Sequence, residues 1–453
     1  MGRVREGETL NNNFSIIWGR RQINSQQLSW YMACAIKQLK GMGIKAGDRI
    51  AICDENSVEY IILLLALWQI KALAAPVSPR WPDKTIASYV SKINAGHLFR
   101  CGDIKRAVCF DARQQIDAKP VPNLDLEQAV TVMATSGSSG EVKAAVHTWG
   151  NHYYSARGSN DIIPLTDSDR WLLSLPLYHV SGIAVLVRCL LSGACLVVDT
   201  HDDVIICVEQ AQVTHVSLVA TQLYRLLSLT KNHDRLRFLK CILLGGSAIP
   251  RALIEQSLDL GLNIYLSYGL TEMSSQVATG KIAAGAPSCV KVLPYRQLQI
   301  SSEGEILVRG EVLFKGYVAG GKFNLPLTKD GWFATGDMGQ LDKEESLSVT
   351  GRRDNMFISG GENIHPEEIE KALLNIKGII EAVVVPKEDK AFGHRPIAFI
   401  KYAGQALAQD YLVGCLQADL PRFKIPIAFY PWPQDLISQG VKIPRQEFLR
   451  KLP

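Results

Sequence analysis

An apolar run leads into a loop of small and hydroxyl residues at Val130-Thr131-Val132-Met133-Ala134-Thr135-Ser136-Gly137-Ser138-Ser139-Gly140-Glu141-Val142-Lys143. The apolar residues predict a buried strand. The loop offers glycines for close backbone approach, N–H and hydroxyl donors, and one cation, which are the groups that cradle a phosphate. It is not a Walker A loop, because Lys143 comes three residues after the last glycine. A flexible surface turn is the alternative interpretation.

Strand and helix alternate on both sides of this loop. Before it, strands are expected at 48–53 and 73–77, and helices at 26–40 and 58–72. After it, four apolar runs with helical segments beside them predict further buried strands. These runs are 171–175, 194–198, 215–219 and 241–244. The alternation predicts parallel α/β layers.

The pattern changes after residue 290. Alternating polarity at 297–300 and 305–309, with Ser-Ser-Glu-Gly between them, predicts a hairpin in an antiparallel region. We place a domain boundary between Arg353 and Asp354. Residues 354–453 then form a small domain, with expected helices at 366–374 and 411–420, strands at 382–385 and 397–402, and a βαβ pattern. Residues 1–353 form the large domain, and the fold class is α/β, multidomain.

Composition excludes several classes of protein. Of the 453 residues, 47% are hydrophobic and 21% are charged, as in soluble globular proteins. A net charge of +5 over this length does not indicate a nucleic-acid binder. The ten cysteines form no CxxC pair and are interpreted as buried residues in a reducing compartment. No signal peptide or membrane span is expected, and self-association into a homo-oligomer is left open.

Four shorter motifs carry groups that suit a nucleotide, although each has a simpler structural interpretation. Tyr268-Gly269-Leu270-Thr271-Glu272 supplies an aromatic ring, a hydroxyl and a carboxylate that could hold Mg²⁺, or it is a helix cap. Asp337 could accept the ribose hydroxyls, or it simply belongs to a turn. Arg352, near Asp354, could donate to the same sugar, or it belongs to a solvated cluster of charges. Lys442, between apolar residues in a Gly- and Pro-bounded loop, could bring a cation to the site, or it is simply exposed.

Taken together and in this chain order, the motifs resemble those of the adenylate-forming superfamily of acyl-CoA synthetases, adenylation domains and luciferases. Three further segments strengthen the resemblance. They are Leu175-Pro176-Leu177-Tyr178-His179-Val180-Ser181-Gly182, Leu244-Gly245-Gly246-Ser247-Ala248 and Ser359-Gly360-Gly361-Glu362-Asn363-Ile364-His365-Pro366-Glu367. The resemblance spans about Gln26 to Lys442. It implies a large domain of αβ layers with a small antiparallel barrel-like part, and a small mobile α+β domain.

The resemblance also implies a two-step reaction and a role for each motif. A carboxylate and ATP would form an acyl-adenylate and pyrophosphate, and coenzyme A would then displace AMP. Lys442 would be the adenylation lysine, Thr271 would contact the α-phosphate, and Glu272 would ligate Mg²⁺. Thr135, Ser136, Gly137, Ser138, Ser139, Gly140 and Lys143 would hold the β- and γ-phosphates. Gly245, Gly246, Ser247, Tyr268 and Gly269 would line the nucleotide and acyl pocket, Asp337 and Arg352 would hold the ribose, and Asp354 would be the hinge.

Within the superfamily, the chain is similar to the subfamily of o-succinylbenzoate–CoA ligases of menaquinone biosynthesis. The similarity rests on the short chain, on residues 143–148, on residues 173–182 and on Phe392-Gly393-His394-Arg395-Pro396. For an aromatic acid with a second carboxylate, His179 is expected to line the acyl pocket. Arg188, inside an apolar run, is expected to bind the second carboxylate, and a salt bridge to another helix is the alternative. A ligase for another aryl or fatty acid, and an adenylation module that loads a carrier protein, remain alternative functions; a cytoplasmic location is expected.

Overall fold

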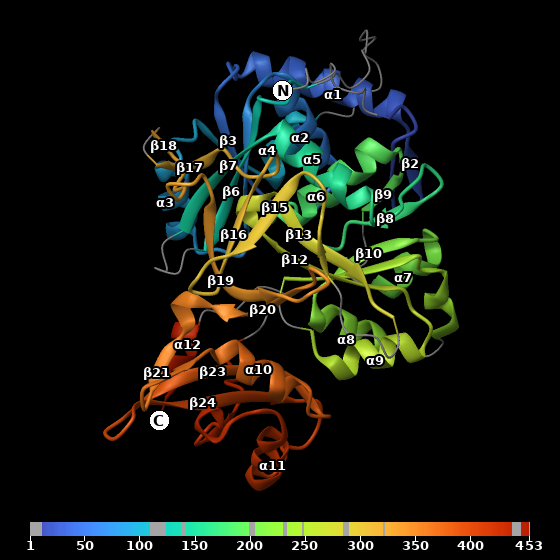
Figure 1. Cartoon of the computed structure of the whole chain (residues 1–453). Coiled ribbons are helices and arrows are strands. Elements are labelled where there is room, and N and C mark those ends of the chain that lie inside the picture. Colours follow the sequence, from blue (N-terminus) through green and yellow to red (C-terminus); the bar gives the residue numbers. More distant parts are fainter. Residues whose placement is uncertain are drawn as a thin grey trace.

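The computed structural model describes residues 11–108, 124–136, 142–198, 204–229, 233–246, 249–283, 290–319, 322–436 and 445–452. Figure 1 shows a large body that holds most of the helices and strands, and a smaller body formed by the last part of the chain. The described residues form four sheets. None of the described helices is long and apolar enough to cross a membrane.

A seven-stranded sheet contains the strand that leads into the Ser/Gly loop. Its order is β18-β17-β7-β6-β4-β3-β5, with β5, β3, β4 and β6 parallel and the remaining pairs antiparallel. The strands are β3 (Arg49–Cys53), β4 (Leu73–Val77), β5 (His97–Arg100), β6 (Ala129–Ser136), β7 (Val142–Thr148), β17 (Gly316–Ala319) and β18 (Lys322–Asn324). The expected strands at 48–53, 73–77 and 130–134 are therefore confirmed.

A nine-stranded sheet contains all four of the later apolar runs. Its order is β14-β13-β12-β11-β10-β8-β9-β1-β2. The strands are β1 (Ser15–Trp18), β2 (Arg21–Ile23), β8 (Arg170–Leu172), β9 (Cys195–Val198), β10 (His215–Leu218), β11 (Cys241–Leu244), β12 (Ile264–Leu270), β13 (Ser275–Lys281) and β14 (Lys291–Val292). Six neighbouring strands of this sheet run parallel, as the alternation predicts; in spatial order they are β12, β11, β10, β8, β9 and β1. Strand β2 at one edge, and β13 and β14 at the other, pair antiparallel.

Helices of the large body form an apolar cluster with strands of these two sheets. Buried side chains of α1, α2, α5 and α6 pack there together with residues of β3 and β8. The helices of the large body are α1 (Ser25–Gly41), α2 (Val58–Gln69), α3 (Asp83–Lys92), α4 (Cys101–Ala107), α5 (Trp149–Asn160), α6 (Val180–Ser192), α7 (Val204–Gln210), α8 (Ala220–Leu229) and α9 (Arg251–Asp259), with the 3₁₀ turns η1 (His233–Phe238) and η2 (Thr271–Met273). Helix α2 ends before the expected residue 72, because Lys71 adopts a positive φ of 62° that no helix continues.

The expected antiparallel region is a four-stranded sheet in the order β15-β16-β19-β20. Its strands are β15 (Arg296–Ile300), β16 (Glu305–Gly310), β19 (Phe333–Leu341) and β20 (Leu347–Arg352), followed by η3 (Arg353–Asn355). The predicted hairpin is confirmed, since Ile300 pairs with Ile306 across the Ser-Ser-Glu-Gly turn. Strands β19 and β20 place Asp337 directly opposite Arg352.

The last part of the chain has its own sheet and apolar clusters, which draw only on residues 357–452. Its elements are β21 (Phe357–Ser359), β22 (Glu362–Ile364), α10 (Pro366–Leu374), β23 (Ile379–Asp389), β24 (Gly393–Tyr402), α11 (Gln409–Asp419), η4 (Arg422–Lys424), β25 (Phe429–Pro431) and α12 (Arg445–Leu449). The expected βαβ pattern is found where α11 connects β24 to β25, because these two strands pair parallel. The expected strands at 382–385 and 397–402 lie in β23 and β24, which pair antiparallel through a short turn.

Buried histidines inside the large body make its stability depend on pH. His147, His152 and His215 are each at most 1% exposed. Burial lowers the pKa of His147 to about 4, and burial together with the neighbouring His147 holds the pKa of His152 well below its ordinary 6.5. The pKa of His215 is also lowered, chiefly by burial. The folded state therefore binds fewer protons than the unfolded chain between pH 4 and 6.5.

We predict that the stability is fully present above pH 6.5 and falls as the pH drops toward 4, by about 1.4 kcal/mol per pH unit for His147, with His152 and His215 contributing in the same direction. Urea midpoints measured from pH 8 to pH 5 check this dependence. His152→Gln removes one of the titrating groups and should flatten the slope, whatever it does to the midpoint at pH 8. An unchanged slope in that variant would contradict the assignment.

Candidate active site

The motif at 268–272 forms a tight turn at the end of β12. The β12–β13 pairing is irregular between Tyr268 and Gly269, and a Cβ atom on Gly269 would lie 1.9 Å from the main-chain oxygen of Ser275. Only glycine fits at that position. Ser274 and Ser275 both have positive φ, 53° and 115°, which is a strained conformation for non-glycine residues. The expected helix cap is a 3₁₀ turn that carries Thr271 and Glu272.

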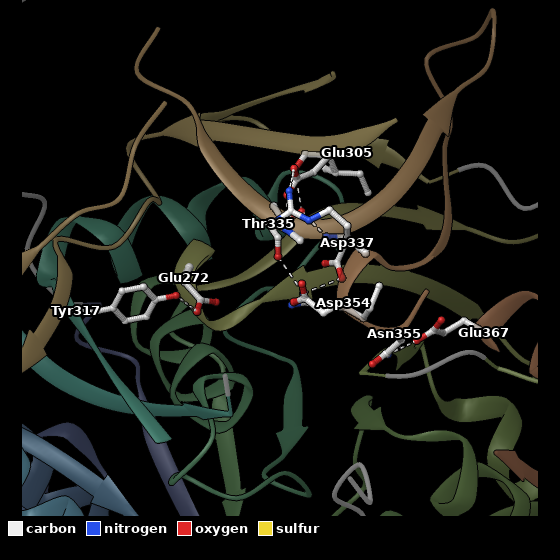
Figure 2. A network of polar contacts seen from close by, with 12 residues as sticks. Glu272, Glu305, Tyr317, Thr335, Asp337, Asp354, Asn355 and Glu367 are labelled. Atoms are coloured by element: carbon white, nitrogen blue, oxygen red, sulfur yellow. Dashed lines mark hydrogen bonds and ion pairs between the residues drawn. The ribbon is translucent and has the colours of Figure 1, made fainter. Parts of the chain in front are cut away.

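Glu272 is buried but keeps one carboxylate oxygen without a partner among the described residues. The Tyr317 hydroxyl donates to Glu272 Oε1 at 2.6 Å (Figure 2). The Phe314 N–H donates to the Glu272 main-chain oxygen at 2.8 Å. Burial and the Glu272 charge raise the pKa of Tyr317, so that tyrosine stays protonated and donates. Glu272 Oε2 remains able to bind a cation.

The described residues contain no group of three or more His, Cys, Asp or Glu side chains that could hold a metal ion. Mg²⁺ is commonly held by one or two carboxylates together with substrate phosphates. Glu272 fits that mode, because it presents a single carboxylate at the end of a strand.

Asp337 joins the end of β12 to the four-stranded sheet. Its Oδ2 accepts the Tyr268 hydroxyl at 2.7 Å, and its Oδ1 accepts Arg352 Nη1 at 3.0 Å. Burial raises the pKa of Tyr268, and Asp337 raises it further. Burial lowers the pKa of Arg352, but the charge of Asp337 outweighs this and the net shift is upward. Asp337 is therefore held in one orientation, with lone pairs left to accept hydroxyl groups.

Two carboxylate contacts beside Asp337 were missed by reasoning from the sequence. Glu305 on β16 accepts the Gly336 N–H at 2.8 Å and forms an ion pair with Arg353 at 2.6 Å. The Glu305 side chain is only 8% exposed. The sequence feature that could have indicated Glu305 is its position as a charged residue at the start of a strand of alternating polarity. Nothing in the sequence identified its distant partners. The Tyr317–Glu272 contact was missed for the same reason.

The strands that flank the Ser/Gly loop approach the Glu272 turn from the seven-stranded sheet. Thr135 on β6 pairs with Lys143 on β7. Lys143 Nζ lies 5.2 Å from the ring centroid of Tyr317, whose hydroxyl bonds to Glu272. Gly137, Ser138, Ser139 and Gly140 lie outside the described residues, and the structure describes only the backbone of Ser136.

His179 and Arg188 are both placed by helix α6. His179 precedes the helix at its N-cap position, and its ring lies 4.9 Å from that of Tyr178. Burial lowers the pKa of His179, and the charge of Arg80 lowers it further. The imidazole is therefore a neutral group at the start of the helix.

Arg188 is 2% exposed and has no ion pair with any described acid. Its Nη2 donates to Gln276 Oε1 at 2.5 Å, and its guanidinium lies 5.2 Å from the Trp171 ring centroid. Its Nε has no hydrogen-bond partner in the described part of the chain. Burial lowers the pKa of Arg188 to about 10. The alternative of a salt bridge to another helix is not found among the described residues. Gln276 pairs with Gly269 in the β12–β13 register, so this cation lies near the Tyr268–Glu272 turn.

Two other expected positions lie at element ends. Gly246 follows β11 with a positive φ of 84°. A Cβ atom on Gly245 would lie 3.1 Å from the main-chain oxygen of Ser267, so β11 and β12 approach closely there. Ser247 and Lys442 lie outside the described residues.

Asp354 lies in η3, between the four-stranded sheet and the C-terminal part. Its Oδ2 is 3.5 Å from Arg352 Nη2, which contacts the large body. The next residue, Asn355, donates to Glu367 Oε1 on α10 at 2.5 Å. Glu367 also forms an ion pair with Arg445 at 2.8 Å, and Arg445 pairs with Glu370 as well. The expected hinge residue, Asp354, thus pairs with Arg352 of the four-stranded sheet, and its neighbour Asn355 bonds to Glu367 of the C-terminal part.

The structure brings most of the described candidates together. Tyr268, Asp337, Arg352 and Asp354 are linked by hydrogen bonds and ion pairs. Thr271 and Glu272 lie in the turn that follows Tyr268, and Figure 2 shows Glu272 in the same region as Asp337 and Asp354. Lys143 is joined to that group through Tyr317, and Arg188 through Gln276. These residues offer cations, a carboxylate oxygen without a partner among the described residues, and hydroxyl donors, which suit a phosphorylated nucleotide beside an anionic substrate.

Comparison with known proteins identifies relatives of this chain. Residues 8–318 match the AMP-binding enzyme family. A 2-succinylbenzoate–CoA ligase of Salmonella typhimurium is 37% identical over 435 residues, which cover 94% of this chain and 93% of that protein. A ligase of the same name from Haemophilus influenzae is 36% identical, over 90% of this chain and 88% of that protein.

Solved structures of similar proteins share the fold. A variant of E. coli MenE with bound OSB-AMS has a TM-score of 0.83 and 29% identity, covering 97% of this chain and 95% of that one. The o-succinylbenzoate CoA synthetase of Bacillus subtilis in complex with ATP and magnesium ion has a TM-score of 0.80 and 29% identity, covering 92% of both chains. The family match spans more than half of the chain, and the relatives match it over nearly their full length. The chain therefore belongs to the family of AMP-binding enzymes.

Proposed function

We propose that this chain ligates 2-succinylbenzoate to coenzyme A through an acyl-adenylate, with release of AMP and pyrophosphate, in menaquinone biosynthesis. The observation that carries the proposal is the near-full-length similarity to 2-succinylbenzoate–CoA ligases. A B. subtilis relative has been captured with the acyl-adenylate intermediate OSB-AMP, at a TM-score of 0.82 and 28% identity. The geometry at the end of β12 supports the same chemistry.

In the first step a carboxylate oxygen attacks the α-phosphorus of ATP, and the bond from that phosphorus to the pyrophosphate oxygen breaks. The step brings two anions together, so it needs cations and N–H donors around the phosphates. We assign Thr135, Ser136, Gly137, Ser138, Ser139, Gly140 and Lys143 to the β- and γ-phosphates. Lys442 approaches the substrate carboxylate and the α-phosphate. Mg²⁺, when bound, neutralises charge on the phosphate oxygens.

The strand-end cluster then holds the nucleotide. Asp337 accepts the ribose hydroxyls, and its orientation is supported by the hydrogen bonds from Tyr268 and Arg352. Thr271 donates its hydroxyl to the α-phosphate, and Glu272 is the carboxylate for the metal. Gly245, Gly246, Ser247 and Gly269 line the nucleotide and acyl pocket, where the absence of side chains at the glycines lets the backbone approach closely.

The acid is held by a neutral histidine and a buried cation. His179 lines the acyl pocket beside the reacting carboxylate. Arg188 binds the carboxylate that does not react. A buried guanidinium that lacks an acidic partner costs stability, and an anionic ligand would compensate for that cost. A substrate with two carboxylates fits this arrangement better than a fatty acid does.

In the second step the thiol of coenzyme A attacks the acyl carbonyl, loses its proton, and displaces AMP. We propose that residues 354–453 form a separate small domain that rotates about Asp354 between the steps. Two observations support this. The C-terminal part has its own apolar clusters, and Asn355 bonds to Glu367 within that part. The ion pairs of Arg445 with Glu367 and Glu370 would let α10 and α12 move together. We further propose a cytoplasmic location, where ATP and coenzyme A are available.

The first test is pyrophosphate release with ATP, Mg²⁺ and a panel of acids, with and without coenzyme A. The panel contains 2-succinylbenzoate, benzoate, a cinnamate and a medium-chain fatty acid. We expect turnover mainly with 2-succinylbenzoate, and conversion of free coenzyme A to its thioester. Preference for another acid would overturn the assigned substrate. Adenylation without thioester formation would instead favour a module that loads a carrier protein.

Replacing Arg188 tests the binding of the second carboxylate. Arg188→Met keeps the side-chain volume but removes the charge, and we expect the KM for 2-succinylbenzoate to rise by about tenfold or more. The KM for ATP should stay unchanged, because the cation is separated from the nucleotide by Gln276. A 2-acylbenzoate that lacks the second carboxylate serves as the control substrate, and its KM should change little. An unchanged KM for 2-succinylbenzoate would reject the assignment.

Replacing Asp337 tests the ribose site. Asp337→Asn keeps the shape but removes the charge that Arg352 and Tyr268 face. We expect the KM for ATP to rise by about tenfold or more, with little change in the KM for the acid. Isotope-labelled ATP binding measured without the acid separates this effect from slower chemistry. Wild-type affinity for ATP in the variant would contradict the role.

A further inference from the structure

A histidine on β7 contacts the Thr271–Glu272 turn, although the proposed mechanism does not use its side chain. His147 is fully buried, and its Nε2 lies 2.7 Å from the main-chain oxygen of Thr271. A carbonyl oxygen only accepts hydrogen bonds, so Nε2 carries the hydrogen and donates. Burial lowers the pKa of His147 to about 4, against a smaller opposing effect of the Thr271 oxygen. The imidazole is therefore neutral, with a bare Nδ1.

The unpartnered Nδ1 of His147 lowers the stability of the folded state, and an apolar side chain would not have this cost. Nδ1 of His147 is buried and has no hydrogen-bond partner among the described residues. A buried acceptor without a partner is destabilising, whereas an apolar side chain of similar size would leave no unpartnered atom. The hydrogen bond from Nε2 to Thr271 is kept in spite of this cost. Unmet polar atoms of this kind are most readily explained where geometry serves a function.

The turn that receives the bond needs support from outside. Ser274 and Ser275, which follow it, both adopt strained positive φ. The Ser155 hydroxyl donates to the Ser274 oxygen at 2.8 Å, and the Phe314 N–H donates to the Glu272 oxygen at 2.8 Å. His147 supplies the corresponding bond at Thr271, at the start of the turn.

The position of His147 along β7 connects this turn to the strand after the Ser/Gly loop. Residues four apart on a strand project to the same face, so His147 shares a face with Lys143. Lys143 Nζ lies over the ring of Tyr317, whose hydroxyl bonds to Glu272. One face of β7 thus contacts the turn at two places. His147 bonds to it directly, and Lys143 contacts Tyr317, which bonds to Glu272.

We propose that His147 is a positioning residue for adenylation, whose Nε2–H bond to the Thr271 oxygen sets the Thr271–Glu272 turn at its working distance from the strand that carries Lys143. The inference rests on the proposed function, because it assigns these two segments to one polyphosphate. His147 acts through the turn and touches neither substrate. Misplacing the α-phosphate contact relative to the β- and γ-phosphate contacts would slow the in-line displacement.

The test compares three variants in the full-length enzyme. His147→Leu removes the donor, and His147→Gln keeps an N–H donor near the position of Nε2. His152→Leu is the matched control. His152 is 1% exposed, its ring centroid lies 5.1 Å from that of His147, and its Nε2 is hydrogen-bonded to the Thr131 hydroxyl rather than to the turn. All three are assayed for pyrophosphate release, and for thioester formation from preformed 2-succinylbenzoyl adenylate.

We expect His147→Leu to lower the kcat of pyrophosphate release by about tenfold or more, with thioester formation from the preformed adenylate changed by less than about twofold. His147→Gln should recover most of the lost rate. His152→Leu should leave both half-reactions within about twofold of wild type. A general loss of folding would lower both half-reactions together. Wild-type adenylation in His147→Leu, or equal losses in both half-reactions, would overturn the proposal.

A measurement on the wild-type enzyme keeps the proposal falsifiable if the leucine variant does not fold. Nitrogen-15 NMR of histidine-labelled enzyme, assigned by comparison with His147→Gln, should show an Nε2–H tautomer for His147. A protonated Nδ1 at neutral pH would overturn the proposal. Failure of the wild type to adenylate 2-succinylbenzoate would reject the proposed function instead, and the two failures are therefore distinct.

Discussion

Two hydrogen bonds from tyrosine hydroxyls to carboxylates hold three sheets together at one point. The Tyr268 hydroxyl joins the end of β12 to Asp337 of the four-stranded sheet, and the Tyr317 hydroxyl joins the seven-stranded sheet to Glu272. Hydrogen bonds to charged acceptors are stronger than neutral ones, and burial strengthens them further. Because Glu272 follows β12, and Asp337 on β19 is bonded to Tyr268 of β12, the site is assembled only when the three sheets meet there. The positions of Asp337 and Glu272 thus depend on the fold of nearly the whole large body.

The sequence was sufficient to locate most strands and helices, but it did not identify which of them, or which side chains, contact one another. Runs such as 241–244 are apolar throughout, and burial on both faces of a parallel sheet requires that pattern, so the strands could be located. The C-terminal part shows the limit of this approach. Strands at 382–385 and 397–402 were located, but their apolar pattern alone does not show that β23 and β24 form a hairpin or that β24 pairs with β25 on its other edge.

The hydrogen-bond partners of the polar site residues could not be predicted from the sequence. These partners lie far away in the chain, and many of them are uncharged side chains or main-chain groups. Tyr268 and Asp337 were both candidates, but no local pattern pairs them. Arg188 was expected to meet either a substrate carboxylate or an acid on another helix, and it meets the amide of Gln276. His147 stood in a segment noted for its resemblance, and only the fold shows that its ring reaches Thr271.

Gln276 also explains how the large body accommodates a second buried cation. Its side-chain oxygen accepts from Arg188, and its main-chain oxygen accepts from Arg296, which is 6% exposed and bonds further to the Pro294 oxygen at 2.9 Å. Burial, together with the charge of Arg188, lowers the pKa of Arg296 to about 9. Two like charges that share one neutral residue repel each other, and no described acid offsets them. An anion that enters beside Arg188 would relieve both the desolvation and the repulsion, so the folded chain gains more from a dicarboxylate there than one ion pair alone would provide.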